Sequence, residues 1–220
     1  MLHKTKGIVF RFTPYGETSI IVNIFTEAFG LQSYIVNSVR SKTSKSKIAL
    51  YQPLTLLDLV VYHKENANIV RIKEATCAYT YHHLTSDPKK SCIGLFINEV
   101  LNKTVREQSH ATELCHFIFD SLITLDHLER AENFHLIFLV KLSKYLGFGP
   151  FAKVELGAWL LSTEEEVILD SLLACDYESP IHMTNEQRRN LLDAFIKFYG
   201  SHVDGMGVIK SVQVLREVLN

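Results

Sequence analysis

Residues 40–47, which are all basic or hydroxyl-bearing, are the part of the sequence best suited to binding an anionic ligand. It carries four positive charges and no negative one, and its other residues are Ser and Thr. Because this composition cannot contribute to an apolar core, we expect a solvated loop between two strands. Many lysine-rich loops are only solvated, but such cations can also neutralise the backbone of a nucleic acid. The four cations are Arg40, Lys42, Lys45 and Lys47.

Catalytic signatures are absent from the sequence. It contains no Gly-x-x-x-x-Gly-Lys-Ser/Thr phosphate loop, no His-Glu-x-x-His pair and no Gly-x-Ser-x-Gly turn. Adjacent histidines such as His82-His83 point in different directions on a helix or strand, so they rarely close on one ion. The acidic run Glu164 to Glu166 is more typical of the first turn of a helix than of a metal site. We therefore expect a protein that is not an enzyme and that uses no metal and no cofactor.

Five short apolar runs surround the basic loop and must position it. β-branched residues fill these runs, and Pro14 and Gly16 punctuate the connection between the first two. Five strands with one basic connection predict a small Greek-key barrel of the OB type. The expected strands lie at residues 7–10, 19–25, 31–36, 54–62 and 69–73.

Further cations and aromatic residues lie on these expected strands. OB barrels bind oligonucleotides across a sheet face and its flanking loops, with cations for phosphates and aromatic rings for stacked bases. Tyr34 is more typical of a core residue than of a stacking residue. We expect binding that is sensitive to salt and largely indifferent to base sequence. The candidate DNA-binding residues are Lys6, Arg11, Arg40, Lys42, Lys45, Lys47, Arg71 and Lys73, with Phe12 and Tyr15 as candidate stacking residues.

The net charge of -1 hides two parts of opposite sign. Residues 1–73 hold ten Lys or Arg against four Asp or Glu, a balance of +6, and residues 74–220 hold thirteen against twenty, a balance of -7. Such an asymmetry favours a polyanion-binding surface on the first part.

The cysteines and the apolar runs indicate the compartment. Four cysteines form no Cys-x-x-Cys pair and lie mostly in apolar sequence, so we expect buried, reduced thiols. The N-terminus lacks an apolar signal region, and no run approaches the ~18 apolar residues of a membrane span. These features predict a soluble, cytoplasmic protein that does not contact a membrane.

Beyond residue 79 the apolar period changes from that of strands to that of helices. The third helix is apolar almost all round, as is typical of the buried helix of a bundle. Ser162 and Thr184 are expected to cap two further helices. The predicted fold class is α+β, with a five-stranded OB barrel at residues 1–78 and an all-α domain at residues 79–220. The expected helices include Pro88 to Arg106, Ala111 to Leu128, Asn133 to Leu146 and Ser211 to Leu219.

Five groups of segments carry a resemblance through their order and spacing. They are Lys6–Val9 with Tyr15–Ser19 and Ile24–Glu27; Val39–Lys42 with Ala49–Leu54; Gly94–Glu99; Tyr145–Pro150; and Lys210–Glu217. In this order they resemble a first hairpin, a basic loop and its following strand, a first long helix, the end of a central helix, and a C-terminal ending. Along nearly the whole chain, this pattern resembles the RecO family of bacterial recombination mediators.

The resemblance implies a function that the residues alone do not. Members of the family bind single- and double-stranded DNA, anneal complementary strands and, with RecR, help to load RecA onto DNA coated by single-stranded-DNA-binding protein. They also dock the acidic, apolar C-terminal tail of that protein on the helical domain. Lys141 or Lys144 could supply the cation at the rim of such a groove, although Leu136 and Ile137 replace the expected upstream arginines. The implied location is the cytoplasm, in association with the nucleoid.

The chain departs from the family at residues 151–183, where many members carry a four-ligand zinc site. Here only Cys175 and His182 are available, and tetrahedral structural zinc needs four ligands. We therefore expect an insert without zinc that folds on Trp159 and its aliphatic neighbours.

Two other functions stay open at the level of sequence. One is a protein-interaction scaffold with a vestigial barrel, which the acidic second domain and the missing zinc ligands make conceivable. The other is an OB-fold RNA-binding protein, which would prefer structured RNA and would not contact RecR.

Overall fold

The computed structural model describes residues 1–40, 45–63, 67–106, 111–149 and 162–219. It forms two compact units, of which the first comprises Met1–Tyr81 with Val105–Ile123 and the second His82–Thr104 with Thr124–Asn220. The first unit therefore contains residues from two separate parts of the chain. The expected domain boundary between residues 78 and 79 stays a prediction.

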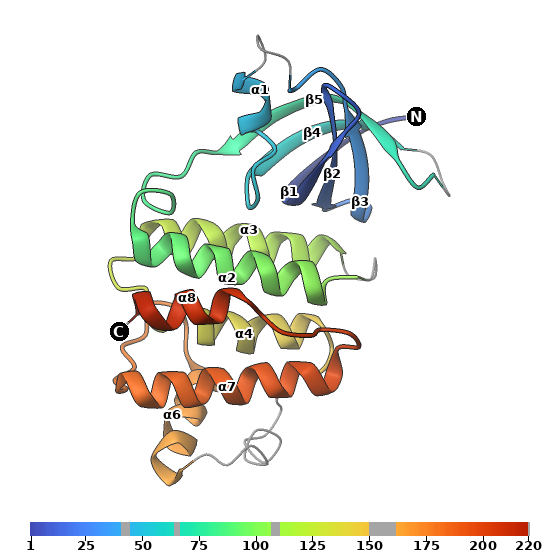
Figure 1. Ribbon diagram of the computed structural model, residues 1–220. Helices are drawn as coiled ribbons and strands as arrows, with labels where there is room; N and C mark the ends of the chain where they lie inside the picture. The colour runs from blue at the N-terminus through green and yellow to red at the C-terminus, as the bar shows by residue number, and fades with distance from the viewer. Residues whose placement is uncertain (41–44, 64–66, 107–110, 150–161, 220) are drawn as a thin grey trace. The chain divides into compact units, whose positions relative to one another are not determined.

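The first unit is a closed barrel in the strand order β1-β2-β3-β5-β4 (Figure 1). Strand β1 pairs antiparallel with β2 and β4, whereas β3 and β5 are parallel. This order is that of the OB fold, and it confirms the predicted α+β class. The elements are β1 (Leu2–Tyr15), β2 (Ser19–Thr26), β3 (Gly30–Val36), α1 (Lys45–Ala49), β4 (Leu56–Tyr62) and β5 (Val70–Tyr79).

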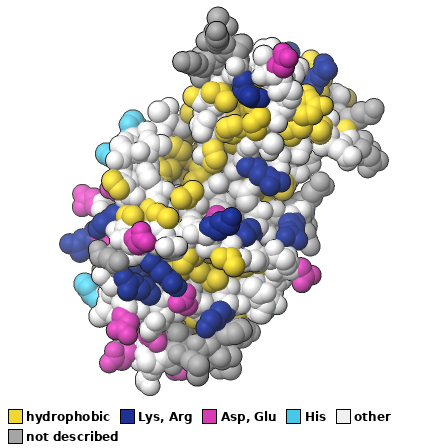
Figure 2. Space-filling model, in the orientation of Figure 1, with side chains coloured by type: hydrophobic (Ala, Val, Ile, Leu, Met, Phe, Trp, Pro, Cys, Tyr) yellow, Lys and Arg dark blue, Asp and Glu magenta, His cyan; other side chains and the backbone are white. Residues whose placement is uncertain are grey.

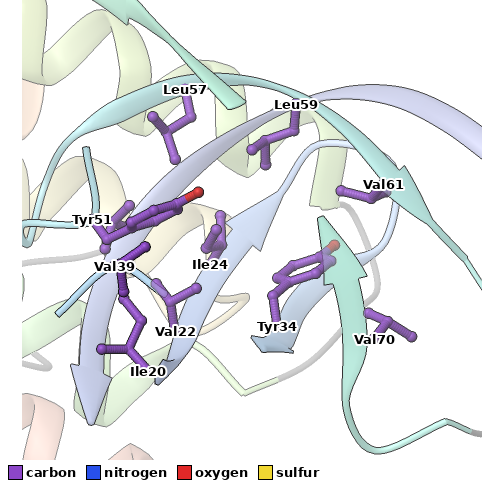
Figure 3. Packing of buried hydrophobic residues seen from close by; sticks show 11 residues of the cluster. Ile20, Val22, Ile24, Tyr34, Val39, Tyr51, Leu57, Leu59, Val61 and Val70 are labelled. Atoms are coloured by element: carbon purple, nitrogen blue, oxygen red, sulfur yellow. The ribbon is translucent and has the colours of Figure 1, made fainter. Parts of the chain in front are cut away.

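Alternate residues of each strand fill the barrel, as the period of a strand requires. Figure 3 shows Tyr34 beside Val61 and Val70, and Tyr51 beside Val39, at separate places in this core. Burial of Tyr34 raises the pKa of its hydroxyl to about 12, so it is a core residue as expected. These packed side chains make the barrel a rigid support for its outer surface.

The barrel has no room for a side chain at Gly7 on β1. A Cβ atom at this position would lie 2.6 Å from Ile24 Cγ2 and 2.9 Å from Leu59 Cδ1, and both partners are buried. The absence of a side chain therefore allows β1 to approach β2 and β4 closely.

Helix α3 (Ala111–His127) contributes its first part to the barrel unit. Thr112 Oγ1 donates to the carbonyl of Glu27 over 3.2 Å, and His116 Nε2 lies 2.7 Å from the Glu27 carboxylate. On β1, Lys6 Nζ lies 5.5 Å from the centre of the Phe119 ring. The outer surface near Lys6 is therefore partly occupied by this helix.

The second unit is helical (Figure 1). Helix α4 is buried on almost every side, as predicted for the central helix of a bundle. Ser162 and Thr184 each form a capping box with the residue three positions later, which confirms both expected caps. The helices are α2 (Pro88–Thr104), α4 (Phe134–Tyr145), α6 (Thr163–Ala174), α7 (Asn185–His202) and α8 (Ser211–Val218).

Polar contacts fix the C-terminal helix α8 against α2. The Glu99 carboxylate accepts hydrogen bonds from the Lys210 amide and from both the amide and hydroxyl of Ser211, at 2.7–2.9 Å. These bonds hold the pKa of Glu99 below its usual value despite the opposing effect of burial. Lys103 Nζ donates to the carbonyl of Met206 over 2.8 Å, so the connection before α8 is also tied to α2.

Several sequence expectations differ from the structure. Strand β1 extends well beyond the expected residues 7–10, because its first half pairs with β4 and its second half with β2. The basic stretch is not loop throughout, because α1 begins at Lys45 and leads into the buried Tyr51. Strand β5 continues past Lys73 to Tyr79, since it goes on pairing with β4 although this part lacks an apolar run. Cys92 and Cys115 are buried as expected, whereas Cys175 is only partly buried. Cys77 is exposed because the barrel core reaches only to Ala75 on β5.

The remaining expectations concern the insert and the membrane. Trp159 lies outside the described residues, so the predicted packing of the insert and the absence of zinc stay predictions. In the part of the chain that the structure describes, no helix combines the length and apolar character of a membrane-spanning segment.

Candidate nucleic-acid interface

The outer surface of the barrel carries two arginines, one on β1 and one on β5, that have no partner among the described residues. Arg11 on β1 lies opposite Asn23 on β2, and Asn23 lies opposite Ser33 on β3. Arg71 on β5 lies beside Ile35 on β3. Both arginines are exposed, and neither forms a hydrogen bond or an ion pair with any described residue. Their guanidinium groups are therefore available to an external anion.

The turn between β1 and β2 adds two more candidate residues to this surface. Tyr15 ends β1 on the same face as Arg11, and 53% of its surface is exposed. Arg40 is anchored to the turn, because its amide donates to the Thr18 carbonyl over 2.9 Å and its Nη1 to the Gly16 carbonyl over 3.2 Å. The structure thus brings Arg11, Tyr15 and Arg40 to one end of the barrel, on the face that Arg71 borders.

Two predicted cations lie elsewhere. Lys6 is on the part of β1 that pairs with β4, opposite Asp58, and it lines a shallow hollow of about 470 Å³ together with Glu27 and Glu74. Lys73 lies at an irregularity of β5, with its Nζ 3.6 Å from the Glu74 carboxylate. Because acidic groups neighbour both lysines, this side of the barrel has mixed charge.

The aromatic candidates also differ in position. Phe12 is half-buried and packs against the barrel core, so its ring is not free to stack on a base. Tyr62, which was not among the sequence candidates, is 47% exposed at the end of β4. The alternation along Leu56–Tyr62 could have identified it, because Tyr62 has the parity of the exposed Asp58.

The basic stretch is only partly described. Lys42 lies outside the described residues, and for Lys45 only the backbone, at the start of α1, is described. Lys47 is exposed in the last turn of α1. The grouping of these three lysines with the arginines of the barrel face stays a prediction.

The two candidate cations of the partner-peptide site lie on α4 of the helical unit. Lys141 Nζ donates to the Asp176 carboxylate over 2.7 Å and lies 5.3 Å from the centre of the Tyr177 ring. This hydrogen bond and charge hold the pKa of Asp176 below its usual value. Lys144 is exposed, with Nζ 3.5 Å from the Leu173 carbonyl. The segment after α6 thus already provides Lys141 with an acidic and an aromatic partner.

Charged and apolar side chains are mixed on the visible surface. On the face that Figure 2 shows, Lys and Arg lie among Asp and Glu over the helical unit, and hydrophobic side chains gather in patches over the barrel and elsewhere. Across the described ranges, no cluster of three or more His, Cys, Asp or Glu residues could hold a metal ion. The barrel face can bind an anionic chain through its arginines.

Comparison with known proteins gives the same family for both units. Residues 1–81 match the family described as Recombination protein O N terminal, and residues 85–153 match Recombination protein O C terminal. The DNA repair protein RecO of Flavobacterium psychrophilum is 34% identical over 99% of either chain. The RecO proteins of Phocaeicola vulgatus and Porphyromonas gingivalis are 33% and 25% identical over 100% and 98% of either chain. The chain therefore belongs to the RecO family of DNA repair proteins.

Proposed function

We propose that this chain is a mediator of DNA repair and homologous recombination that makes and breaks no covalent bond. It binds single- and double-stranded DNA, anneals complementary strands and, with RecR, helps to load RecA onto DNA coated by single-stranded-DNA-binding protein. Such a protein acts on the nucleoid in the cytoplasm.

The observation that carries the proposal is a pair of exposed arginines on the OB barrel that have no partner among the described residues. Arg11 on β1 and Arg71 on β5 are both exposed on the outside of this closed barrel. Arg40 extends the same surface at the turn that precedes β2. Exposed cations on the outside of an OB barrel can contact phosphates of one strand, because OB barrels hold oligonucleotides across their outer surface and flanking loops.

Annealing requires little beyond this arrangement. Two complementary strands repel each other through their phosphates, and cations on a rigid surface reduce that repulsion. None of Arg11, Arg40 and Arg71 needs to contact a base edge, so the bases stay free to pair. The same property makes binding largely independent of sequence.

Docking of an acidic tail on the helical unit would use Lys141. A tail carboxylate would compete with Asp176, whose side chain is exposed and held chiefly by Lys141. An Asp176→Asn variant should therefore bind a labelled acidic peptide more tightly than the wild type, whereas Lys141→Ala should bind it more weakly. Equal affinity of all three proteins would place the tail elsewhere.

A salt titration tests the DNA-binding part of the proposal. We compare the double variant Arg11→Ala, Arg71→Ala with a matched control, Lys197→Ala, Lys210→Ala, which removes two exposed cations from the helical unit. Loss of two phosphate contacts should reduce the slope of log K against log salt by about 1.4 for single strands, at about 0.7 per contact. The control should keep the wild-type slope. If the arginine variant also kept the wild-type affinity and slope, this face would not be the DNA site.

A further inference from the structure

The end of β4 carries an exposed aromatic side chain that the fold does not use. Tyr62 lies opposite Leu2 on β1, and the two side chains are 47% and 44% exposed. The Tyr62 hydroxyl forms no hydrogen bond, and its ring makes no ring contact, with any residue of the described ranges. Single exposed apolar residues are common on protein surfaces, so the case for a ligand depends on what lies beside this ring.

The strand register places Arg71 beside this tyrosine. The last recorded pair of β4 and β5 is Val61 with Ile72, and both side chains point into the barrel. Continuing the antiparallel register by one residue brings Tyr62 opposite Arg71, with both on the outer face. Side chains opposite each other on one face lie about 4.5–5.5 Å apart at Cβ, so this register would put the ring and the guanidinium within reach of one ligand.

The backbone beneath Tyr62 is held firmly. The His63 amide donates to the Met1 carbonyl over 3.1 Å, and the N-terminal amine lies 3.4 Å from the His63 carbonyl. The His63 ring stacks on Phe29 at 3.9 Å between ring centres, and His3 packs edge-on against both. Because these contacts already order the strand end, binding of a ligand at Tyr62 would lose little conformational entropy there.

We propose that Tyr62 and Arg71 form a subsite that stacks one unpaired nucleobase of single-stranded DNA. Arg71 binds the adjacent phosphate, and the base lies on the exposed tyrosine ring. This inference rests on the proposed DNA binding and adds to it a preference for unpaired strands. Arg71 would link the subsite to the rest of the barrel surface, because it pairs with Ile35 on β3 and lies next to Ile72, which pairs with Val61 on β4.

The charge of this surface favours a nucleic acid over an apolar protein segment. Among the described residues Arg71 has no acidic partner, so its charge would remain exposed beside a purely apolar ligand. A nucleotide satisfies both groups, since it combines a flat base with an anionic phosphate. In duplex DNA the bases are stacked on one another, so only an unpaired strand can use the ring.

The test compares Tyr62→Ala, Tyr62→Leu and Tyr62→Phe in the full chain. The probes are a fluorescent oligothymidylate of about 15 nucleotides, which covers one OB site, and a duplex of equal length. Ala and Leu should weaken single-strand binding about 5- to 150-fold, the cost of losing one stacked base, while duplex binding and the salt slope stay unchanged. Phe should bind as the wild type does. Tyr145→Ala, which removes an exposed tyrosine from α4, is the matched control and should have no effect.

The outcomes separate this inference from the proposed function. If Tyr62→Ala and Tyr62→Leu bind single strands as tightly as the wild type, the stacking subsite is wrong. The proposed DNA binding would not be affected by that result, because it is tested separately by the Arg11→Ala, Arg71→Ala variant. If Tyr62→Ala weakens single-strand binding but Tyr62→Leu does not, the position supplies apolar packing and the inference also fails. Equal losses for single strands and duplex would point to a general defect of the barrel, which circular dichroism and the unfolding midpoint would reveal.

Discussion

A buried carboxylate in the helical unit offers a sharp test of how the segment before α2 is held. The side chain of Asp126, near the end of α3, is fully buried. It accepts hydrogen bonds from three consecutive backbone amides, those of His82 at 3.0 Å, His83 at 2.7 Å and Leu84 at 2.6 Å. In addition, the buried Lys90 donates to the Asp126 carbonyl over 2.7 Å. Substitution of this aspartate by alanine should therefore free the turn that leads into α2.

The expected cost follows from the exposure of the three amides. A hydrogen bond to a charged acceptor contributes about 1.5–3 kcal/mol to the free energy of unfolding. Where water can take the place of the lost acceptor, the net loss of stability is smaller. His82 and His83 are exposed and can be rehydrated, whereas Leu84 is buried and its amide would stay unpaired. We therefore expect Asp126→Ala to lower the free energy of unfolding by about 3–5 kcal/mol. Asp126→Asn keeps one carbonyl acceptor and should cost about half as much.

Urea unfolding and hydrogen exchange measure this effect together. The matched control is Asp120→Ala, which removes an exposed carboxylate from the same helix and should change stability by less than about 0.5 kcal/mol. The Leu84 amide should exchange much faster in Asp126→Ala than in the wild type. A loss below about 1 kcal/mol with unchanged protection of that amide would refute the assigned role of the carboxylate.

Two further predictions concern buried positions in the two units. Burial, with the Arg188 charge, lowers the pKa of His135 to about 3. Between about pH 6.5 and pH 3 the unfolded chain takes up a proton on this histidine that the folded chain does not. The free energy of unfolding should therefore fall by up to about 1.4 kcal/mol for each unit by which the pH is lowered. His135→Leu should lack this contribution when both proteins are unfolded with urea at pH 7, 6 and 5. Gly7→Ala should lower the free energy of unfolding by about 1–3 kcal/mol, because the new Cβ would overlap Ile24 and Leu59. Gly200→Ala is the control: it lies at an exposed helix position with open space around it and should raise the free energy of unfolding by about 0.5–1 kcal/mol. Equal unfolding midpoints for the two variants would contradict the packing at Gly7.

The architecture was predictable because its signals are local. Strand-like apolar runs and helical periods followed each other in the order that the structure has, and the capping residues Ser162 and Thr184 marked two helix starts. The second half of β5 was not predictable in the same way. It carries Glu74 and Thr76 on its outer side and is ordered by pairing with β4 rather than by its own apolar residues.

The grouping of the site residues depended on register, which composition does not reveal. Arg11 and Lys6 both lie on the outer side of β1, but Arg11 faces β2 and Lys6 faces Asp58 on β4. The irregularity between Val9 and Arg11 shifts the alternation within the strand, and no residue of the sequence marks it. Arg40 was a candidate for its charge, yet its place at the β1–β2 turn follows from hydrogen bonds to the carbonyls of Gly16 and Thr18.

The combination of arginines and an exposed tyrosine has a consequence for annealing. Arginines that contact phosphates hold single strands and duplex alike, so by themselves they would retain the product of annealing. A stacking contribution from Tyr62 exists only while a base is unpaired, so pairing removes it and weakens binding at the moment the duplex forms. Under the proposed function, the protein would therefore favour the substrates of annealing over the product without any change in its own conformation. In this proposal, Arg71, which has no partner among the described residues, would capture the strand by its charge, and the exposed Tyr62 would distinguish unpaired from paired bases by stacking.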